Sequence, residues 1–211
     1  MKLALARLGA VLALVPAACA SDAVAPERSG EATIDWRDIA TEHDRSRLRG
    51  WRSAWSRALD RAVAGGHAEA IAGEGPLLDP DSAIDWQDPP PGLYRCRTIK
   101  LGARSAGMLD FVAYPPFECR IRQEEGVTSF AKVGGSQRPI GLLFPYGEER
   151  MVFLGTLQLG DETRALQYGR DRERDLVALV ERIDERRWRL VFPSPHFESL
   201  LDVVELTPET P

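Results

Sequence analysis

The sequence predicts an α+β fold in which a helical N-terminal segment packs on an antiparallel β-barrel or strongly curled meander of eight or nine strands. An apolar stripe with helical spacing occupies residues 41–66. From Gly92 onward, short strand-like runs follow one another, with turn residues between them and no helix-length segment. Sequential strands with tight connections form antiparallel meanders, and eight or more of them tend to close into a barrel, which removes exposed edges.

The first twenty residues have the pattern of a secretory signal. Lys2 and Arg7 precede an apolar run at residues 8–15, and small residues follow it. This run is too short to span a bilayer, which takes about 20 apolar residues. We therefore expect residues 1–20 to be a signal peptide and the mature protein to work in the periplasm, on the periplasmic face of a membrane, or outside the cell.

Two ways of processing this signal remain open. Cys19 follows two alanines and fits the lipid-accepting cysteine of a bacterial lipoprotein, although Pro16 stands where an apolar residue such as Leu is usual. Alternatively, an ordinary signal peptidase cleaves after Ala20, and Cys19 is lost. We favour lipidation of Cys19, whose acyl chains would each contribute about 0.8 kcal/mol per buried methylene to membrane anchoring. The polar residues 21–34 would then form a flexible tether.

The charge of the chain argues against a nucleic-acid partner. The formal net charge is -5, and it becomes -7 when Lys2 and Arg7 are removed with the signal. Nucleic-acid-binding proteins usually carry a basic surface instead. A hydrophobic fraction of 44% is ordinary for a globular domain. We therefore expect contact with a membrane only through the lipid anchor.

A helix is predicted over residues 41–66. Its first turn resembles a capping box, with Asp44 standing in for the usual Glu. The apolar stripe includes Trp51 and Trp55, recurs every three or four residues, and needs a surface to cover. That surface is the barrel wall or one of its mouths. Gly50 lies inside the helix and costs about 1 kcal/mol relative to Ala.

A connector links this helix to the strands. A short second helix is expected over residues 67–72. Residues 73–91 follow, and their prolines and aspartates forbid regular structure. Residues 35–91 thus form the helical segment with its connector, and residues 92–208 form the barrel-like domain.

Nine strands are predicted in the second part of the chain, separated by turn residues such as Gly107. They are expected at residues 92–102, 111–124, 127–134, 138–145, 150–160, 164–169, 174–184, 187–193 and 199–207. The run at 174–184 also fits a helix. We favour a strand there because another strand-like run follows it at hairpin distance.

Cys96 and Cys119 are the only other cysteines. In an oxidising compartment such a pair usually forms a disulfide. Both residues lie on the apolar faces of their strands, and folding the strands about Gly107 places Cys96 opposite Cys119. We therefore predict a Cys96–Cys119 disulfide, which would stabilise the fold by about 3 kcal/mol.

Motifs for catalysis, metals and nucleotides are missing from the sequence. The three histidines, His43, His67 and His196, form no H-E-x-x-H pattern. There is no G-x-S-x-G elbow, Walker loop or dinucleotide fingerprint. Ser194 lies near His196, but neither a base contact nor an oxyanion donor follows from the sequence. We expect no catalytic residues, no metal site and no cofactor.

Four segments resemble an uncharacterised family of secreted, lipoprotein-like proteins from alphaproteobacteria, defined by a domain of unknown function. They are Tyr-Arg-Cys-Arg at 94–97, Phe-Glu-Cys-Arg-Ile at 117–121, the ending at 201–208 and the helix start at 44–48. The resemblance implies a location in the cell envelope and no activity. In architecture alone, the β half also resembles lipocalin-like barrels, including small periplasmic inhibitors of metalloproteases.

The function that we predict is a monomeric, non-catalytic envelope protein that binds a small apolar ligand or a protein partner through its barrel. The large residues expected inside are Phe130, Phe144, Phe153, Leu157 and Phe192. A filled interior favours a protein partner, whereas an apolar pocket of about 300 Å³ or more favours a ligand. The alternatives are a cofactor-independent hydrolase that uses His196, and a structural envelope lipoprotein with an exposed apolar patch.

Overall fold

The computed structural model describes residues 34–209. The signal peptide at 1–20, the lipidation candidate Cys19 and all but the last residue of the tether at 21–34 lie outside the described residues, so they stay predictions. The described chain runs from a helical segment into an antiparallel β-barrel. The predicted α+β fold class is therefore confirmed.

Short helices precede the barrel. They are α1 (Trp36–Ile39), α2 (Glu42–Arg49), α3 (Trp51–Ala64), α4 (Ala68–Gly73) and the 3-10 turn η1 (Gly75–Leu77). The Thr41 side chain accepts a hydrogen bond from the backbone N–H of Asp44, which confirms the predicted cap. The prediction of one continuous helix is wrong, because the backbone of Gly50 leaves the helical conformation and separates α2 from α3. In the described part of the chain, no helix has the length and apolar character needed to cross a membrane.

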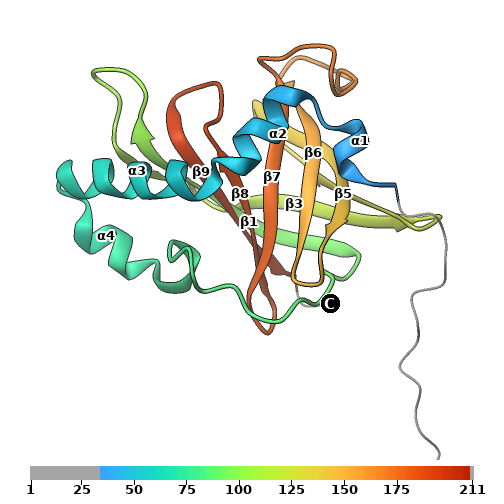
Figure 1. The fold of residues 1–211 in the computed structure, drawn as a ribbon, viewed down its shortest axis with the longest axis horizontal. Coiled ribbons are helices and arrows are strands. Elements are labelled where there is room, and N and C mark those ends of the chain that lie inside the picture. The colour runs from blue at the N-terminus through green and yellow to red at the C-terminus, as the bar shows by residue number, and fades with distance from the viewer. Residues whose placement is uncertain (1–33, 210–211) are drawn as a thin grey trace, which may run out of the picture. The chain divides into compact units, whose positions relative to one another are not determined.

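The strands close on themselves. They are β1 (Gly92–Ala103), β2 (Phe111–Ala113), β3 (Phe117–Glu124), β4 (Val127–Lys132), β5 (Gln137–Tyr146), β6 (Arg150–Leu159), β7 (Asp175–Asp184), β8 (Arg187–Pro193) and β9 (Ser199–Pro208). Consecutive strands pair antiparallel from β3 to β9, and β1 pairs with both β3 and β9. β1 and β3–β9 thus form a closed eight-stranded barrel, and β2 is an extra strand on β1 (Figure 1).

Two of the predicted strands differ from the structure. The run predicted as one strand over 111–124 is split into β2 and β3, because Pro115 and Pro116 lack the N–H groups that a strand ladder needs. The prediction of a strand at 164–169 is wrong, because β6 pairs directly with β7 and residues 160–174 form a loop. Of the two alternatives for residues 174–184, the favoured strand is confirmed, since Asp175–Asp184 is strand β7.

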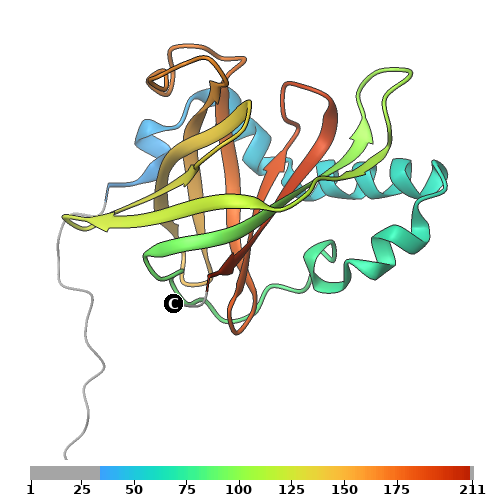
Figure 2. The ribbon, with the colours of Figure 1, turned by 180° about the vertical axis from the view of Figure 1, so that it is seen from behind.

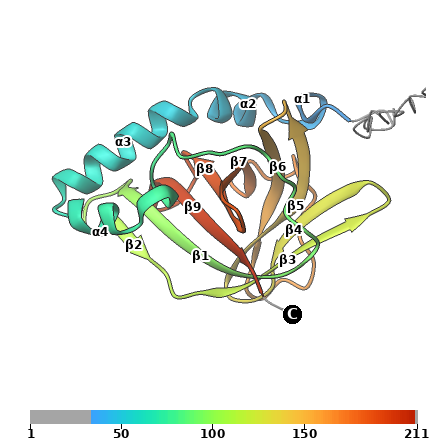
Figure 3. The same cartoon turned by 90° about the horizontal axis from the view of Figure 1, so that it is seen from below.

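The alternation of side chains along the strands gives the barrel two cores. Outward residues of β1, β7, β8 and β9 pack against α2 and α3, and Trp55 is fully buried among them. Inward residues form a separate core inside the barrel. α1, α2 and α3 follow one another along one side of the barrel, so of the two expected arrangements the helices take the one on the wall (Figure 3).

A buried ion pair joins α2 to the barrel. Arg47 Nη1 lies 2.8 Å from Asp44 Oδ1, and both side chains are buried. Arg47 Nε donates to the carbonyl oxygen of Pro193 at the end of β8 (3.1 Å). The Tyr168 hydroxyl, in the loop at 160–174, donates to Asp44 Oδ2 (2.6 Å). The Asp44–Arg47 pair therefore connects the helix to the barrel through Arg47 and to the loop through Asp44, by charge-assisted hydrogen bonds.

A second buried arginine joins the connector to the barrel. Arg189 Nη2 on β8 lies 2.7 Å from Glu181 Oε2 on β7, and both side chains are fully buried. Arg189 Nη1 donates to the carbonyl oxygen of Leu77 in η1 (3.1 Å). Its guanidinium carbon lies 4.7 Å from the centroid of the Trp55 ring on α3. These contacts hold α3 and η1 on the same side of the barrel.

Candidate functional site

One end of the barrel is hollow. A cavity of about 650 Å³ lies there, and each of the eight barrel strands contributes at least one residue to its lining. The end of the loop at 160–174 and the β8–β9 loop also line it. These two loops stand at the same end of the barrel (Figure 2). The exposed side chains of Tyr114, in the β2–β3 connection, and Phe197, in the β8–β9 loop, belong to the lining, so the cavity reaches solvent there.

The walls of the cavity are mainly apolar. The main apolar lining residues are Phe117, Phe130, Leu157, Leu176, Phe192 and Val204. Large side chains fill the barrel elsewhere, where the Tyr94 ring packs edge to face on Trp188. An eight-stranded barrel can be filled by side chains or can hold one small ligand. This barrel combines a filled part with a hollow end.

Four of the five large residues that were expected inside the barrel lie there. These four are Phe130, Phe153, Leu157 and Phe192. The prediction for Phe144 is wrong, because this side chain lies in the outer core. Its neighbour Leu143 faces inward, and alternation along β5 therefore turns Phe144 outward.

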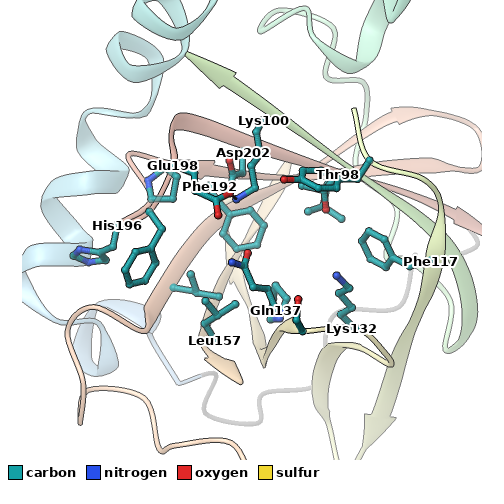
Figure 4. Close-up of a pocket in the computed structure, with 18 of the residues that line it drawn as sticks. Thr98, Lys100, Phe117, Lys132, Gln137, Leu157, Phe192, His196, Glu198 and Asp202 are labelled. Carbon is teal, nitrogen blue, oxygen red and sulfur yellow. Dashed lines mark ion pairs between the residues drawn. The ribbon is translucent and has the colours of Figure 1, made fainter. Parts of the chain in front are cut away.

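An ionic cluster occupies one wall of the cavity (Figure 4). Lys100 Nζ on β1 lies 2.8 Å from Glu198 Oε2 and 3.4 Å from Asp202 Oδ2, and the Ser199 hydroxyl donates to Asp202 Oδ1. Burial alone would lower the pKa of Lys100, but Asp202 and Glu198 outweigh it and raise that pKa. Burial raises the pKa of Asp202 against the opposing charge of Lys100, and the hydrogen bond from Lys100 lowers the pKa of Glu198. The ammonium of Lys100 is thus paired with two carboxylates of the protein.

A second lysine faces the same cavity. Lys132, at the end of β4, is half-buried, and its Nζ lies 4.2 Å from the centroid of the Phe117 ring. Among the described residues, no ion pair includes Lys132. Burial lowers the pKa of Lys132 and outweighs the opposite effect of the neighbouring Cys119. The two lysines of the cavity therefore differ, because only Lys100 is paired.

The β8–β9 loop forms part of the rim. Ser194 and Glu198, near its two ends, have positive φ angles of 48° and 67°, which residues other than glycine rarely adopt. Between them, His196 lines the cavity, and its carbonyl oxygen accepts a hydrogen bond from Arg104 Nη1 (3.2 Å). Such backbone conformations persist where the surrounding contacts impose them.

The structure does not bring Ser194 and His196 together. His196 stacks on His43 with ring centroids 5.1 Å apart, and its buried Nε2 has no hydrogen-bond partner in the part of the chain that the structure describes. The N–H of Ser194 donates to the carbonyl oxygen of Leu200. Burial lowers the pKa of His196, and the positive charge of Arg47 and the neighbouring His43 lower it further. The proximity of Ser194 and His196 in the sequence therefore yields no nucleophile–base contact in the described structure.

The two cysteines lie together inside the barrel. Both are fully buried and are free thiols in the structure. The Cys96 side chain is within hydrogen-bonding reach of Cys119, and burial, followed by this hydrogen bond, raises the pKa of the Cys96 thiol. The Cys96–Cys119 disulfide therefore stays a prediction, although the structure places the two residues near each other.

The register predicted for this hairpin is wrong by two residues. Cys96 pairs with Phe117, and Cys119 pairs with Tyr94. The β1–β2 ladder, in which Leu101 pairs with Phe111, places the centre of the turn earlier than Gly107. The cysteines therefore face the interior as diagonal neighbours, which remain within side-chain reach of each other.

The described residues contain no group of three or more His, Cys, Asp and Glu side chains that could hold a metal ion. The two acids of the ionic cluster, Glu198 and Asp202, form ion pairs with Lys100.

Sequence reasoning missed the charged residues of the cavity. A signal for two of them was present, because Lys100 has the same parity as Cys96 along β1, and Lys132 has the same parity as Phe130 along β4. A charged residue on the same strand face as inward apolar residues is expected to be buried or to line a cavity. The position of Glu198 depends on the irregular β8–β9 loop, which no strand pattern describes.

Comparison with known proteins identifies one family. A family model described as a domain of unknown function (DUF4893) matches residues 36–206. This range includes the helical segment, the whole cavity lining and all but the end of β9. No curated protein and no solved structure matches the chain.

Proposed function

The chain belongs to the DUF4893 family, whose description gives no function, and we propose that it is a non-catalytic cell-envelope protein that holds one small apolar molecule in the hollow end of its barrel. The observation that carries the proposal is the cavity of about 650 Å³ with mainly apolar walls. Ligand pockets for small molecules have volumes of about 300–1,000 Å³ and are lined by apolar and aromatic side chains with a few polar groups. The hollow end therefore favours a small ligand, whereas a completely filled barrel would favour a protein partner.

The envelope location rests on the N-terminal sequence. A basic start, a short apolar run and small residues around Cys19 support export, with Cys19 as the lipid-bearing residue of a lipoprotein. A lipid anchor at Cys19 followed by a polar tether would leave the barrel in the periplasm, as a monomer close to a membrane surface. Export also supports a Cys96–Cys119 disulfide, because the periplasm is oxidising and the two side chains are neighbours.

Binding of an uncharged dye tests the proposal. N-phenyl-1-naphthylamine becomes fluorescent in apolar surroundings, so its titration into the purified mature protein measures access to the cavity. Leu157 lies on the apolar wall, and Leu157→Trp is expected to fill the cavity and abolish the fluorescence increase. Leu93→Trp is the matched control, because Leu93 is exposed and lies outside the cavity lining.

The expected result is saturable binding by the wild type and by Leu93→Trp, and none by Leu157→Trp. Circular dichroism and thermal unfolding of all three proteins show whether they are folded. A folded wild type that gives no saturable signal contradicts the proposal. So does a folded Leu157→Trp variant that binds the dye as the wild type does.

A further inference from the structure

We propose that the ligand of this cavity is an anionic amphiphile, a molecule with an apolar body and a single negatively charged head group that pairs with Lys132. This inference rests on the proposed function and adds to it the chemical class of the ligand. It follows from a comparison between the two lysines that face the same cavity.

Lys100 already forms ion pairs with carboxylates of the protein itself. Its Nζ lies within ion-pair distance of Glu198 and Asp202, and its side chain is only 12% exposed. A ligand anion at Lys100 would have to compete with two carboxylates that already hold the ammonium. Lys100 therefore offers little to a negatively charged head group.

Lys132, in contrast to Lys100, has no carboxylate partner among the described residues. It is half-buried, and its Nζ lies over the Phe117 ring. A buried charge without a partner is unfavourable, and an anion placed beside it removes that cost. The lowered pKa of Lys132 is in accord with this, because burial disfavours the charged ammonium.

The surroundings of Lys132 fit the rest of such a molecule. Phe117 lies beside its ammonium, and Phe130, two residues earlier on β4, faces the same side of the strand. The labelled side chains of Phe117, Lys132, Leu157 and Phe192 surround one space (Figure 4). A head group at Lys132 therefore leaves an apolar chain free to lie along Leu157 and Phe192.

The carboxylates of the cavity restrict the charge of the ligand further. Glu198 and Asp202, which pair with Lys100, are acidic residues of the cavity lining, and Glu173 belongs to the lining as well. A second negative charge on the ligand would approach these acids. One compact anion with a single charge, such as a carboxylate or a phosphodiester, is therefore the head group that the cavity accepts.

Displacement of N-phenyl-1-naphthylamine measures this preference with probes that share one chain. Dodecanoate and 1-dodecanol differ in head group, and lauroyl-lysophosphatidylglycerol carries the same acyl chain on a phosphate-containing head group. All are used below their critical micelle concentrations. We expect at least one of the two anions to bind about tenfold more tightly than dodecanol, as for a charge-assisted hydrogen bond in partly buried surroundings. The stronger of the two anions identifies a free fatty acid or a lysophospholipid as the source of the head group.

Variants assign the preference to Lys132. Lys132→Gln should lose the preference for anions, whereas Lys132→Arg should retain it; the preference is taken within each protein, as the ratio of the affinities for the anion and for dodecanol. Arg122→Gln is the matched control, since Arg122 is an exposed arginine on the neighbouring strand β3 and lies outside the cavity lining. This control should keep the full preference, although it removes the same charge.

The outcomes separate the two proposals. Dye binding without any preference for either anion over dodecanol overturns the anionic ligand and leaves the apolar cavity function standing. A preference that persists in Lys132→Gln, or that disappears in Arg122→Gln, overturns the assignment to Lys132. Failure of the wild type to bind the dye contradicts the proposed function itself.

Discussion

Arg47 and Asp44 form an ion pair one helical turn apart on α2, with a separation of 2.8 Å and both side chains buried against the barrel. The pair lies close to the cavity rim, because Arg47 also donates to Pro193, the residue that precedes the β8–β9 loop. Helix α2 thus fixes the strand end from which the rim loop starts. The helical segment is therefore part of the support of the candidate site.

Removal of Arg47 should destabilise the fold strongly. Arg47→Met leaves the carboxylate of Asp44 buried without its cation, and breaking a buried pair in this way costs about 3–5 kcal/mol. Urea unfolding followed by circular dichroism measures the change. Arg49→Met is the matched control on the same helix, because the Arg49–Glu42 pair is exposed and such pairs contribute little. Equal unfolding midpoints for the two variants would refute the structural role of Arg47.

Gly155 should tolerate no side chain. It pairs with Gly141 across β5 and β6, and a Cβ atom on Gly155 would collide with the backbone of Ile140 and with the Phe153 ring. Because overpacking costs about 1–3 kcal/mol or more, Gly155→Ala should lower the free energy of unfolding by at least that amount. Gly73→Ala serves as the control, since a Cβ at Gly73 meets nothing within 4 Å. An unchanged melting temperature for Gly155→Ala would mean that β5 and β6 do not approach as closely as described.

Cys96 should resist alkylation in the folded, reduced protein. The side chain is fully buried and burial raises its pKa, so the reactive thiolate is scarce near neutral pH. Iodoacetamide labelling followed by peptide mass spectrometry should modify Cys96 only after unfolding. Rapid native labelling of Cys96 would contradict the described burial.

The same two cysteines should form a disulfide when the protein is folded in an oxidising buffer. The oxidised protein should weigh less by two hydrogens and should be more stable than the reduced protein by about 3 kcal/mol. The double variant Cys96→Ala, Cys119→Ala provides the control, because its stability should not depend on the redox buffer. Persistence of both thiols after refolding with oxidised glutathione would contradict the pairing.

His196 should make stability fall at mildly acidic pH. Its pKa is lowered in the folded protein, mainly by burial, so below its unfolded value of about 6.5 the unfolded chain binds a proton that the folded chain refuses. The contribution of neutral His196 is therefore complete above that value and is lost as the pH falls through the lower, folded pKa. The free energy of unfolding should decrease less between pH 7.5 and 5 in His196→Gln than in the wild type, which urea titrations at both pH values measure. Parallel pH profiles would show that His196 is not the group responsible.

Alternation and turn chemistry were sufficient to predict the fold class. The strands from residue 174 onward were predicted within a residue or two, because Asp175–Asp184 and Arg187–Pro193 have β-rich patterns at hairpin distance. The pattern failed where tertiary contacts decide. Residues 164–169 have strand-like composition, yet β6 and β7 pair with each other and leave no neighbour for a further strand between them. The split at Pro115–Pro116 follows from the missing N–H groups of the two prolines, which alternation alone does not take into account.

The candidate site was less predictable than the fold. Inward aromatic residues such as Phe130 follow from parity, but the hollow end depends on how far side chains from all eight strands reach across the barrel. The difference between Lys100 and Lys132 arises from Glu198 and Asp202, which lie about a hundred residues from Lys100 in the sequence. Such partners are brought together only by barrel closure between β1 and β9.

If the hollow end of the barrel holds a small molecule, native mass spectrometry of protein purified from its own cells should detect it. Wild type and Leu157→Trp are purified side by side without denaturants or added lipids. We expect a one-to-one adduct on the wild type, released on unfolding as an anionic amphiphile, and no such adduct on the variant whose cavity is filled. The same adduct on both folded proteins, or an adduct on neither of them, would refute a ligand in the cavity.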